Sequence, residues 1–217
     1  MKDARYQLKL RITEIFYSIQ GESTRAGEPC VFVRLTGCNL RCTYCDTGYS
    51  FYGGEHVTIH NILKEIDKYK CKLVEITGGE PLLQDNTYPL VDILVDNFYK
   101  VLIETSGSIK INKLNQHVIK ILDIKTPSSQ MAHFNLWDNL NDLNNLNDEI
   151  KFVIGNKADY DWSKQVITQY GLNKRCKRVL MSPTHGILSP GQLGQWICED
   201  GLDVKLQIQL HKYLNMP

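Results

Sequence analysis

Three cysteines lie within eight residues of one short segment, GCNLRCTYCDT at residues 37–47. Their spacing is C-x3-C-x2-C, at Cys38, Cys42 and Cys45. Thiolates this close together can hold three corners of a cubane iron–sulfur cluster and leave the fourth iron without a protein ligand. An open iron can chelate a small molecule, and a reducing cluster can then pass it an electron. The segment therefore predicts a redox-active 4Fe–4S cluster.

Two other interpretations of the same cysteines remain open. One is a structural zinc site whose fourth ligand is Cys30, His56 or His60, and the other is three incidental buried thiols. Zinc sites favour paired C-x2-C knuckles, and this sequence has no second pair. The density of cysteines argues against chance. We therefore favour the cluster.

The elements that position this segment alternate along the chain. Short β-branched runs predict strands at about residues 31–35, 73–76, 101–104, 119–124, 151–154, 179–181 and 204–208. Helical patterns separate most of them, at about 59–69, 88–98, 158–170 and 190–200. Strand–helix alternation predicts an α/β fold with a mainly parallel sheet, either open and doubly wound or curled into a partial barrel. The Asn- and Asp-rich segment 135–149 predicts a frayed helix or a loop with one amphipathic turn.

The strands read as continuous apolar runs, which is typical of a sheet covered on both faces. Polar clusters follow them: TGGEP at 77–81, TSG at 105–107 and KTPSS at 125–129. The first strand runs directly into the cysteines. Because ligands gather at the carboxyl ends of parallel strands, we expect these clusters to form one site.

The bulk composition is that of an ordinary globular chain. It has 217 residues, 42% hydrophobic and 23% charged, with a net charge of +1. That charge suggests no nucleic-acid partner, and neither a signal peptide nor an apolar run long enough to span a bilayer is present. Seven cysteines without an export signal indicate reduced thiols. We expect a single cytoplasmic domain over residues 1–217.

With Tyr44 as the aromatic residue, C-x3-C-x-aromatic-C resembles the signature of the radical S-adenosylmethionine (SAM) superfamily, and TGGEP resembles its GGE motif. The resemblance implies a full or partial (β/α) barrel, here a shortened one. It also implies that the open iron binds the amino and carboxylate groups of SAM. Reductive cleavage then gives a 5′-deoxyadenosyl radical that takes hydrogen from the substrate.

Three longer segments resemble one family of that superfamily, the 7-carboxy-7-deazaguanine synthases. They are EIFYSIQGESTRAGEPCVFVRLTGCNLRC at 14–42, LDIKTPSSQM at 122–131 and LQIQLHKYLNMP at 206–217. Two departures stand out: Tyr44 occupies a position where tryptophan is frequent, and Ser23-Thr24 replace a glycine-containing stretch.

The resemblance implies a role for each matching residue. The implied substrate contacts are Gln20, Gly21, Glu22, Arg34, Thr77, His211 and the terminal carboxylate of Pro217. The implied SAM contacts are Tyr44, Asp46, Gly78, Gly79, Glu80, Ser106, Lys125, Ser128 and Ser129. Thr47 matches a magnesium position.

Simpler roles stay open for several of these residues. Glu22 can be a capping or turn residue, Arg34 can form an ion pair on the sheet surface, and Lys125 can pair with Asp123 or Glu104. The last residues can also be a frayed tail.

The activity that the resemblance implies is a lyase reaction of deazapurine biosynthesis, such as that of queuosine. It converts 6-carboxy-5,6,7,8-tetrahydropterin to 7-carboxy-7-deazaguanine with release of ammonia, using the cluster, SAM and Mg2+. The implied enzyme is a homodimer that receives electrons from a donor such as flavodoxin. The alternatives are a glycyl-radical activase acting on a partner protein and a non-catalytic zinc-binding interaction module.

Overall fold

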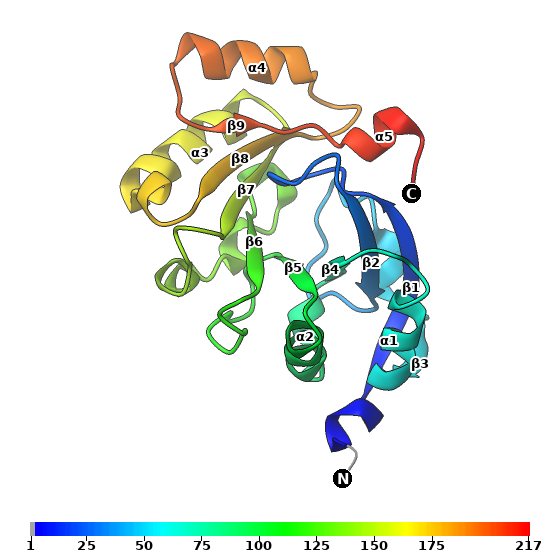
Figure 1. Ribbon diagram of the computed structural model, residues 1–217. Helices are drawn as coiled ribbons and strands as arrows, with labels where there is room; N and C mark the ends of the chain where they lie inside the picture. The colour runs from blue at the N-terminus through cyan, green and yellow to red at the C-terminus, as the bar shows by residue number, and fades with distance from the viewer. Residues whose placement is uncertain (1–2) are drawn as a thin grey trace.

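The computed structural model describes residues 3–217, which form one nine-stranded sheet with helices against it (Figure 1). The strands are β1 (Lys9–Ile19), β2 (Pro29–Leu35), β3 (Glu55–Thr58), β4 (Leu73–Gly78), β5 (Lys100–Thr105), β6 (Ile119–Ile124), β7 (Glu149–Ile154), β8 (Arg178–Pro183) and β9 (Lys205–Leu206). The helices are α1 (Ile59–Ile66), α2 (Thr87–Asp96), α3 (Lys157–Tyr170), α4 (Pro190–Glu199) and α5 (Leu210–Leu214).

The sheet is mixed and open, in the order β3-β1-β2-β4-β5-β6-β7-β8-β9. β1 pairs antiparallel with β2 and β3, whereas β2 and β4 to β9 run parallel. Figure 1 shows α1 to α4 on the outside of the curved sheet, and the C-terminal segment returning towards β1 and β2. The predicted fold class, a shortened partial barrel with mainly parallel strands, is confirmed.

Local sequence explains where the helices begin and end. The Thr58 side chain caps α1 by accepting from the backbone N–H of Asn61 at 3.3 Å. Asn156 caps α3 in the same way, and α3 ends at Gly171, whose φ of 60° suits glycine. Among residues 3–217, no helix is both long and apolar enough to cross a membrane.

The two faces of the sheet differ in chemistry. On the outer face Val74, Ile76 and Ile103 are buried against α1 and α2, and a second apolar cluster lies beneath α3 and α4. The strands therefore alternate with a period of two. Their other positions face inwards, where a small apolar cluster around Phe32 and Leu102 gives way to charged residues. The expectation of continuously apolar strands is wrong on this face.

Three further elements fall outside the predicted strands and helices: β1 and β3, which add the antiparallel edge, and the short helix α5. Within 135–149, which the sequence predicted as a frayed helix or a loop with one amphipathic turn, the structure forms a short 3-10 helix at Trp137–Asn141. Trp137 stacks on Tyr170 of α3, with ring centroids 4.6 Å apart, so tertiary packing fixes this segment.

Candidate active site

A cavity of about 370 Å³ lies over the inner face of the sheet. It is lined by most of the residues that the sequence marked: Gln20, Gly21, Glu22, Arg34, Cys38, Cys42, Tyr44, Cys45, Asp46, Thr47, Thr77, Gly78, Gly79, Ser106, Lys125, His211 and Pro217. Three marked residues lie behind the lining: Glu80, Ser128 and Ser129. Segments far apart in the chain thus meet at one cavity.

The cysteine loop (residues 37–47) is held in part by hydrogen bonds from Thr43. Thr43 donates from its hydroxyl to Ser128 O at 2.7 Å and from its N–H to Ser129 O at 3.3 Å. Ser128 and Ser129 therefore anchor this loop through their carbonyls. The Ser128 side chain is occupied by Asp159, and the Ser129 hydroxyl donates to Thr126 O at 2.6 Å.

The glycine motif presses directly on the cysteine loop. A Cβ on Gly79 would overlap the carbonyl oxygen of Gly37 and lie 2.7 Å from Cys38 Cβ. Glycine is therefore required for this close approach. The carboxylate of Glu80 is fully buried and accepts hydrogen bonds from Thr105 Oγ1 at 2.8 Å and from the Ser106 N–H at 2.8 Å. Glu80 thus fixes the end of β5 beneath the cavity.

The three cysteines of the loop are the candidate ligands of a cluster. All three cysteines are free and line the same cavity. A zinc ion needs its ligands at about 2.3 Å from one point, whereas a cubane spreads its thiolates over separate irons. This arrangement suits Cys38, Cys42 and Cys45 as ligands of a 4Fe–4S cluster.

Lys125 lies beside these cysteines. Its Nζ pairs with Asp123 Oδ2 at 2.9 Å, so the ion pair considered from the sequence is present in the cavity wall. Burial opposes its charge, but Asp123 and the neighbouring Cys42 and Tyr44 outweigh burial and raise the pKa of Lys125. Lys125 is therefore a fixed positive charge between the cysteine loop and the sheet.

The β1–β2 loop (residues 20–28) enters the cavity with its side chains already oriented. The Gln20 amide donates from Nε2 to Glu75 Oε2 and accepts at Oε1 from the Glu22 N–H at 3.0 Å. These two bonds fix which end of the amide is the donor. Its second N–H bonds no side chain within residues 3–217, so it can donate to a molecule in the cavity.

Glu22 is held by three donors from distant parts of the chain. Its carboxylate accepts from Lys151 Nζ at 2.7 Å, Gln207 Nε2 at 2.7 Å and Gln209 Nε2 at 3.0 Å. Burial raises the pKa of a carboxyl, but the charge and hydrogen bond of Lys151 outweigh it, and the pKa of Glu22 is lowered. Glu22 is therefore an anion within the cavity wall.

Arg34 points into the same cavity from β2. Its Nε donates to Glu14 Oε1 at 2.7 Å, so the ion pair considered as an alternative is also present. The guanidinium carbon lies 5.7 Å from the Phe16 ring centroid and 5.8 Å from that of Tyr49. Among the described residues, its terminal nitrogens donate to no side chain. They remain able to bind a carboxylate with two hydrogen bonds.

The C-terminal segment (residues 207–217) packs over the β1–β2 loop. Leu210 donates its N–H to Gly21 O at 2.9 Å, and Ser18 Oγ donates to Pro217 O at 2.9 Å. A Cβ on Gly21 would overlap Nδ1 of His211, so only glycine permits this contact. Burial lowers the pKa of His211, which favours a neutral imidazole at neutral pH.

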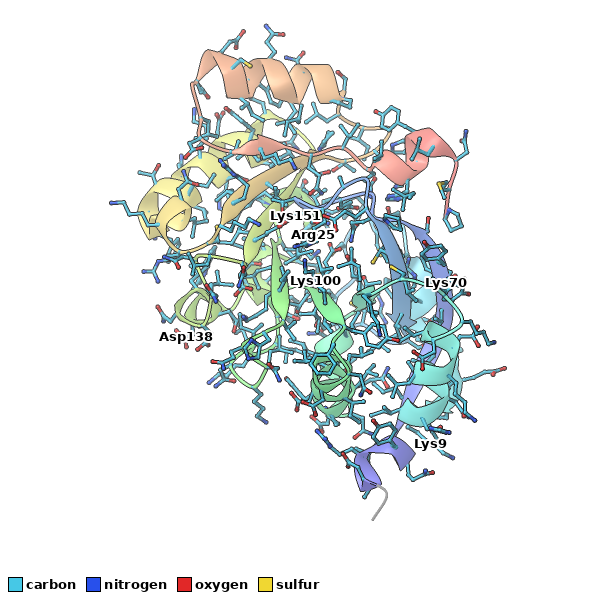
Figure 2. The ribbon with its side chains drawn as sticks, in the orientation of Figure 1. Lys9, Arg25, Lys70, Lys100, Asp138 and Lys151 are labelled. Carbon is cyan, nitrogen blue, oxygen red and sulfur yellow. The ribbon has the colours of Figure 1, made fainter. Side chains whose placement is uncertain are left out.

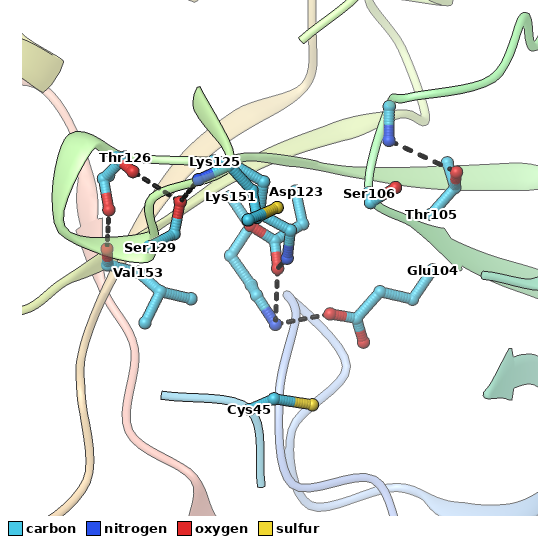
Figure 3. Close-up of polar contacts among 12 residues, drawn as sticks. Cys45, Glu104, Thr105, Ser106, Asp123, Lys125, Thr126, Ser129, Lys151 and Val153 are labelled. Carbon is cyan, nitrogen blue, oxygen red and sulfur yellow. Dashed lines mark hydrogen bonds and ion pairs between the residues drawn. The ribbon is translucent and has the colours of Figure 1, made fainter. Parts of the chain in front are cut away.

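A row of charged side chains on the inner face is the feature that sequence reasoning missed. Four successive parallel strands each contribute one: Glu75, Glu104, Asp123 and Lys151. Lys151 Nζ pairs with Glu104 and lies 3.9 Å from Asp123 Oδ2 (Figure 3). Figure 2 shows Lys151 inside the molecule, whereas Lys9 is on the periphery.

These charges alter one another's ionisation. Burial, the charge of Glu104 and that of Glu22 raise the pKa of Glu75 to about 8. Burial also raises the pKa of Glu104, whereas its carboxylate neighbours outweigh burial at Lys151 and raise the pKa of that amine. The signal for this row was present in the sequence as a single charged residue within each of LVEIT, VLIET, ILDI and KFVI.

Thr47 lies at the end of the cysteine loop and lines the cavity. Its hydroxyl is 3.7 Å from Cys45 Sγ, and it can offer one neutral oxygen to a cation. The neighbouring Asp46 carboxylate is engaged by Lys212 at 2.7 Å and by Gln209 at 3.2 Å. Thr47 fits magnesium only as one ligand among several, because Mg2+ prefers six oxygens and keeps water.

The cysteine loop over an open, mainly parallel sheet defines a radical SAM protein, and the Radical SAM superfamily profile matches residues 32–125. The chain is 43% identical to the 7-carboxy-7-deazaguanine synthase of Koribacter versatilis, over 96% of this chain and 98% of that one. It is 42% identical to the enzyme of that name from Chlorobaculum tepidum, over 96% and 95%. The chain therefore belongs to the 7-carboxy-7-deazaguanine synthase family, which confirms the resemblance seen in its sequence.

A solved structure agrees in fold. The crystal structure of QueE from Escherichia coli superimposes with a TM-score of 0.80, covering 97% of this chain and 100% of that chain. Sequence identity there is 22%, so this likeness concerns the fold alone.

Proposed function

We propose that the protein is a radical SAM lyase that converts 6-carboxy-5,6,7,8-tetrahydropterin to 7-carboxy-7-deazaguanine with release of ammonia. One observation carries the proposal. The three cysteines, the β1–β2 loop and the C-terminal segment line the same cavity, so a cofactor at the cysteines would touch a substrate held by the other two. The full-length match to synthases of that name supports the choice of substrate.

The cluster and SAM, when bound at the cysteine loop, supply the one-electron chemistry that removes a hydrogen atom from the substrate. We assign the cluster to Cys38, Cys42 and Cys45. Gly79 lets the glycine motif pack directly against the cysteine loop. Ser106, held by Glu80, lies in the cavity wall.

The remaining residues bind and orient the pterin. Arg34 uses its free terminal nitrogens to clamp the substrate carboxylate, and Gln20 donates its second amide N–H to the ring carbonyl. Glu22 accepts from the amino edge of the ring. Neutral His211 can share a hydrogen bond without adding charge. These contacts also hold the reacting carbon at one place and exclude water.

Magnesium would bind at Thr47 together with oxygens of the substrate and water. We further propose that the enzyme is a cytoplasmic homodimer that takes electrons from a donor such as flavodoxin, as the family resemblance implies. A glycyl-radical activase is not favoured, because the polar groups above converge on a cavity suited to a small polar substrate.

Anaerobic turnover tests the proposal. Cluster-loaded protein is incubated with 6-carboxytetrahydropterin, SAM, Mg2+ and a reductant, and products are identified by mass spectrometry. We expect 7-carboxy-7-deazaguanine, and its loss in Cys42→Ala. Matched controls come from Cys176→Ala, because Cys176 is buried in the apolar core away from the cavity. Cleavage of SAM to 5′-deoxyadenosine without the deazaguanine product would refute the substrate assignment.

A further inference from the structure

Gln209 lies between the two loops that build the cavity. Its Nε2 donates to Glu22 Oε1 of the β1–β2 loop at 3.0 Å and to Asp46 Oδ2 of the cysteine loop at 3.2 Å. Asp46 directly follows Cys45, which we assign to the cluster. One amide nitrogen therefore joins the loop that would hold the pterin to the loop that would hold the cofactor.

The chemistry of the three groups makes this bridge specific. Glu22 and Asp46 are carboxylates, which only accept hydrogen bonds, and two like charges at one cavity repel each other. An amide NH2 has two donor hydrogens on one atom, so it can satisfy one carboxylate with each. Removing that group leaves two carboxylates that face each other with one fewer donor.

The flanking residues of the C-terminal segment each hold one loop only. Gln207 donates from Nε2 to Glu22 Oε2 at 2.7 Å and accepts the Ser23 N–H at 2.7 Å, which anchors the β1–β2 loop alone. Lys212 Nζ donates to Asp46 Oδ2 at 2.7 Å, which anchors the cysteine loop alone. The chain thus provides matched controls on either side of Gln209.

We propose that Gln209 is a positioning residue that couples the binding of SAM at the cysteine loop to the binding of the pterin at the β1–β2 loop. This inference rests on the proposed function. A ligand that orders one loop also orders the other through Gln209, so the second ligand loses less conformational freedom on binding. The coupling is reciprocal by thermodynamic necessity.

Calorimetry of the anaerobic, cluster-loaded protein measures the coupling without turnover, because no reductant is added. The Kd of 6-carboxytetrahydropterin is determined with and without SAM, and the ratio of the two values is the coupling factor. We expect Gln209→Met to lower this factor about fivefold or more, the scale of typical allosteric couplings. Gln207→Met should weaken pterin binding equally in both titrations, and Lys212→Met should weaken SAM binding, each with the coupling factor unchanged.

Hydrogen exchange provides a second readout that needs no pterin. In the wild type, addition of SAM alone should slow amide exchange in residues 20–28, and in Gln209→Met that protection should disappear while protection of residues 37–47 remains. A wild-type coupling factor in Gln209→Met, or unchanged protection of residues 20–28, overturns the inference. Failure of the wild type to bind the pterin overturns the proposed substrate instead, and hydrogen exchange still decides the role of Gln209.

Discussion

Glu75 is a buried acid whose pKa is raised, and the effect of that shift on stability can be measured. Its side chain lies on the inner face of β4, is 3% exposed and accepts a hydrogen bond from Gln20. Burial, together with the charges of Glu104 and Glu22, raises its pKa from the usual 4.5 to about 8. Around neutral pH the folded protein therefore keeps a proton on Glu75 that the unfolded chain releases.

The raised pKa makes stability depend on pH in a known direction. A group with a raised pKa in the folded state contributes its stability below the unfolded value of 4.5, and that contribution is lost as pH rises towards 8. Each unit of pKa corresponds to about 1.4 kcal/mol, so the full effect reaches about 5 kcal/mol. Glu75→Gln keeps the acceptor for Gln20 but cannot ionise. The variant should therefore gain stability relative to the wild type as pH rises.

Thermal melting of cluster-loaded protein at pH 5, 6, 7 and 8 measures this difference. For a chain of this size 1 kcal/mol moves Tm by about 3 °C, so the variant should gain about 10 °C on the wild type between pH 5 and 8. Glu55→Gln, at an exposed position on β3, is the control for replacing a glutamate elsewhere in the sheet. If the Tm difference between Glu75→Gln and the wild type does not change with pH, the reasoning is refuted, because Glu75 would then ionise as an exposed glutamate does.

Two further substitutions test the packing of the site and of the sheet. Gly79→Ala forces a methyl group into the cysteine loop, so the iron and sulfide content per chain should fall by more than half, with the circular dichroism spectrum unchanged. Gly191→Ala is the control: its Cβ would meet nothing closer than 3.7 Å, so this variant should bind the cluster normally. Lys120→Met leaves the fully buried Asp148 without its 2.7 Å ion pair, which should cost about 3–5 kcal/mol in urea unfolding. Adding Asp148→Asn should recover most of that loss, and a cost below about 1 kcal/mol for the single change would contradict the assignment.

Much of the fold could be predicted because the sequence patterns that indicate its strands and helices are local. The β-branched runs of β4 to β8 and the helix caps at Thr58 and Asn156 depend on neighbours within a few residues. β1 was not identified because its eleven residues mix Lys, Arg and Glu with apolar residues, as suits a strand that is only partly buried. Its pairing with β2 and β3 is seen only in the tertiary structure and leaves no local signal in the sequence.

The residues of the site also fall into two groups: those marked by local sequence and those that only the tertiary structure shows. The cysteine spacing was sufficient to mark the loop, because three ligands within eight residues need no distant partner. Glu80 was expected to contact SAM, yet its carboxylate accepts hydrogen bonds from Thr105 at the end of β5 and from Ser106 directly after it. The inner-face charges were overlooked because one charged residue inside an apolar run does not disturb its hydrophobic character. Only the strand register shows that four of them face the same cavity.

The contact between Ser18 and Pro217 joins residues 199 positions apart. The β1–β2 loop also takes hydrogen bonds from Gln207, Gln209 and Leu210. During synthesis the N-terminal half of the cavity therefore emerges from the ribosome long before the segment that covers it, and such long-range closure is slow. A cluster inserted during that interval would reach the cysteines before residues 207–217 cover the cavity.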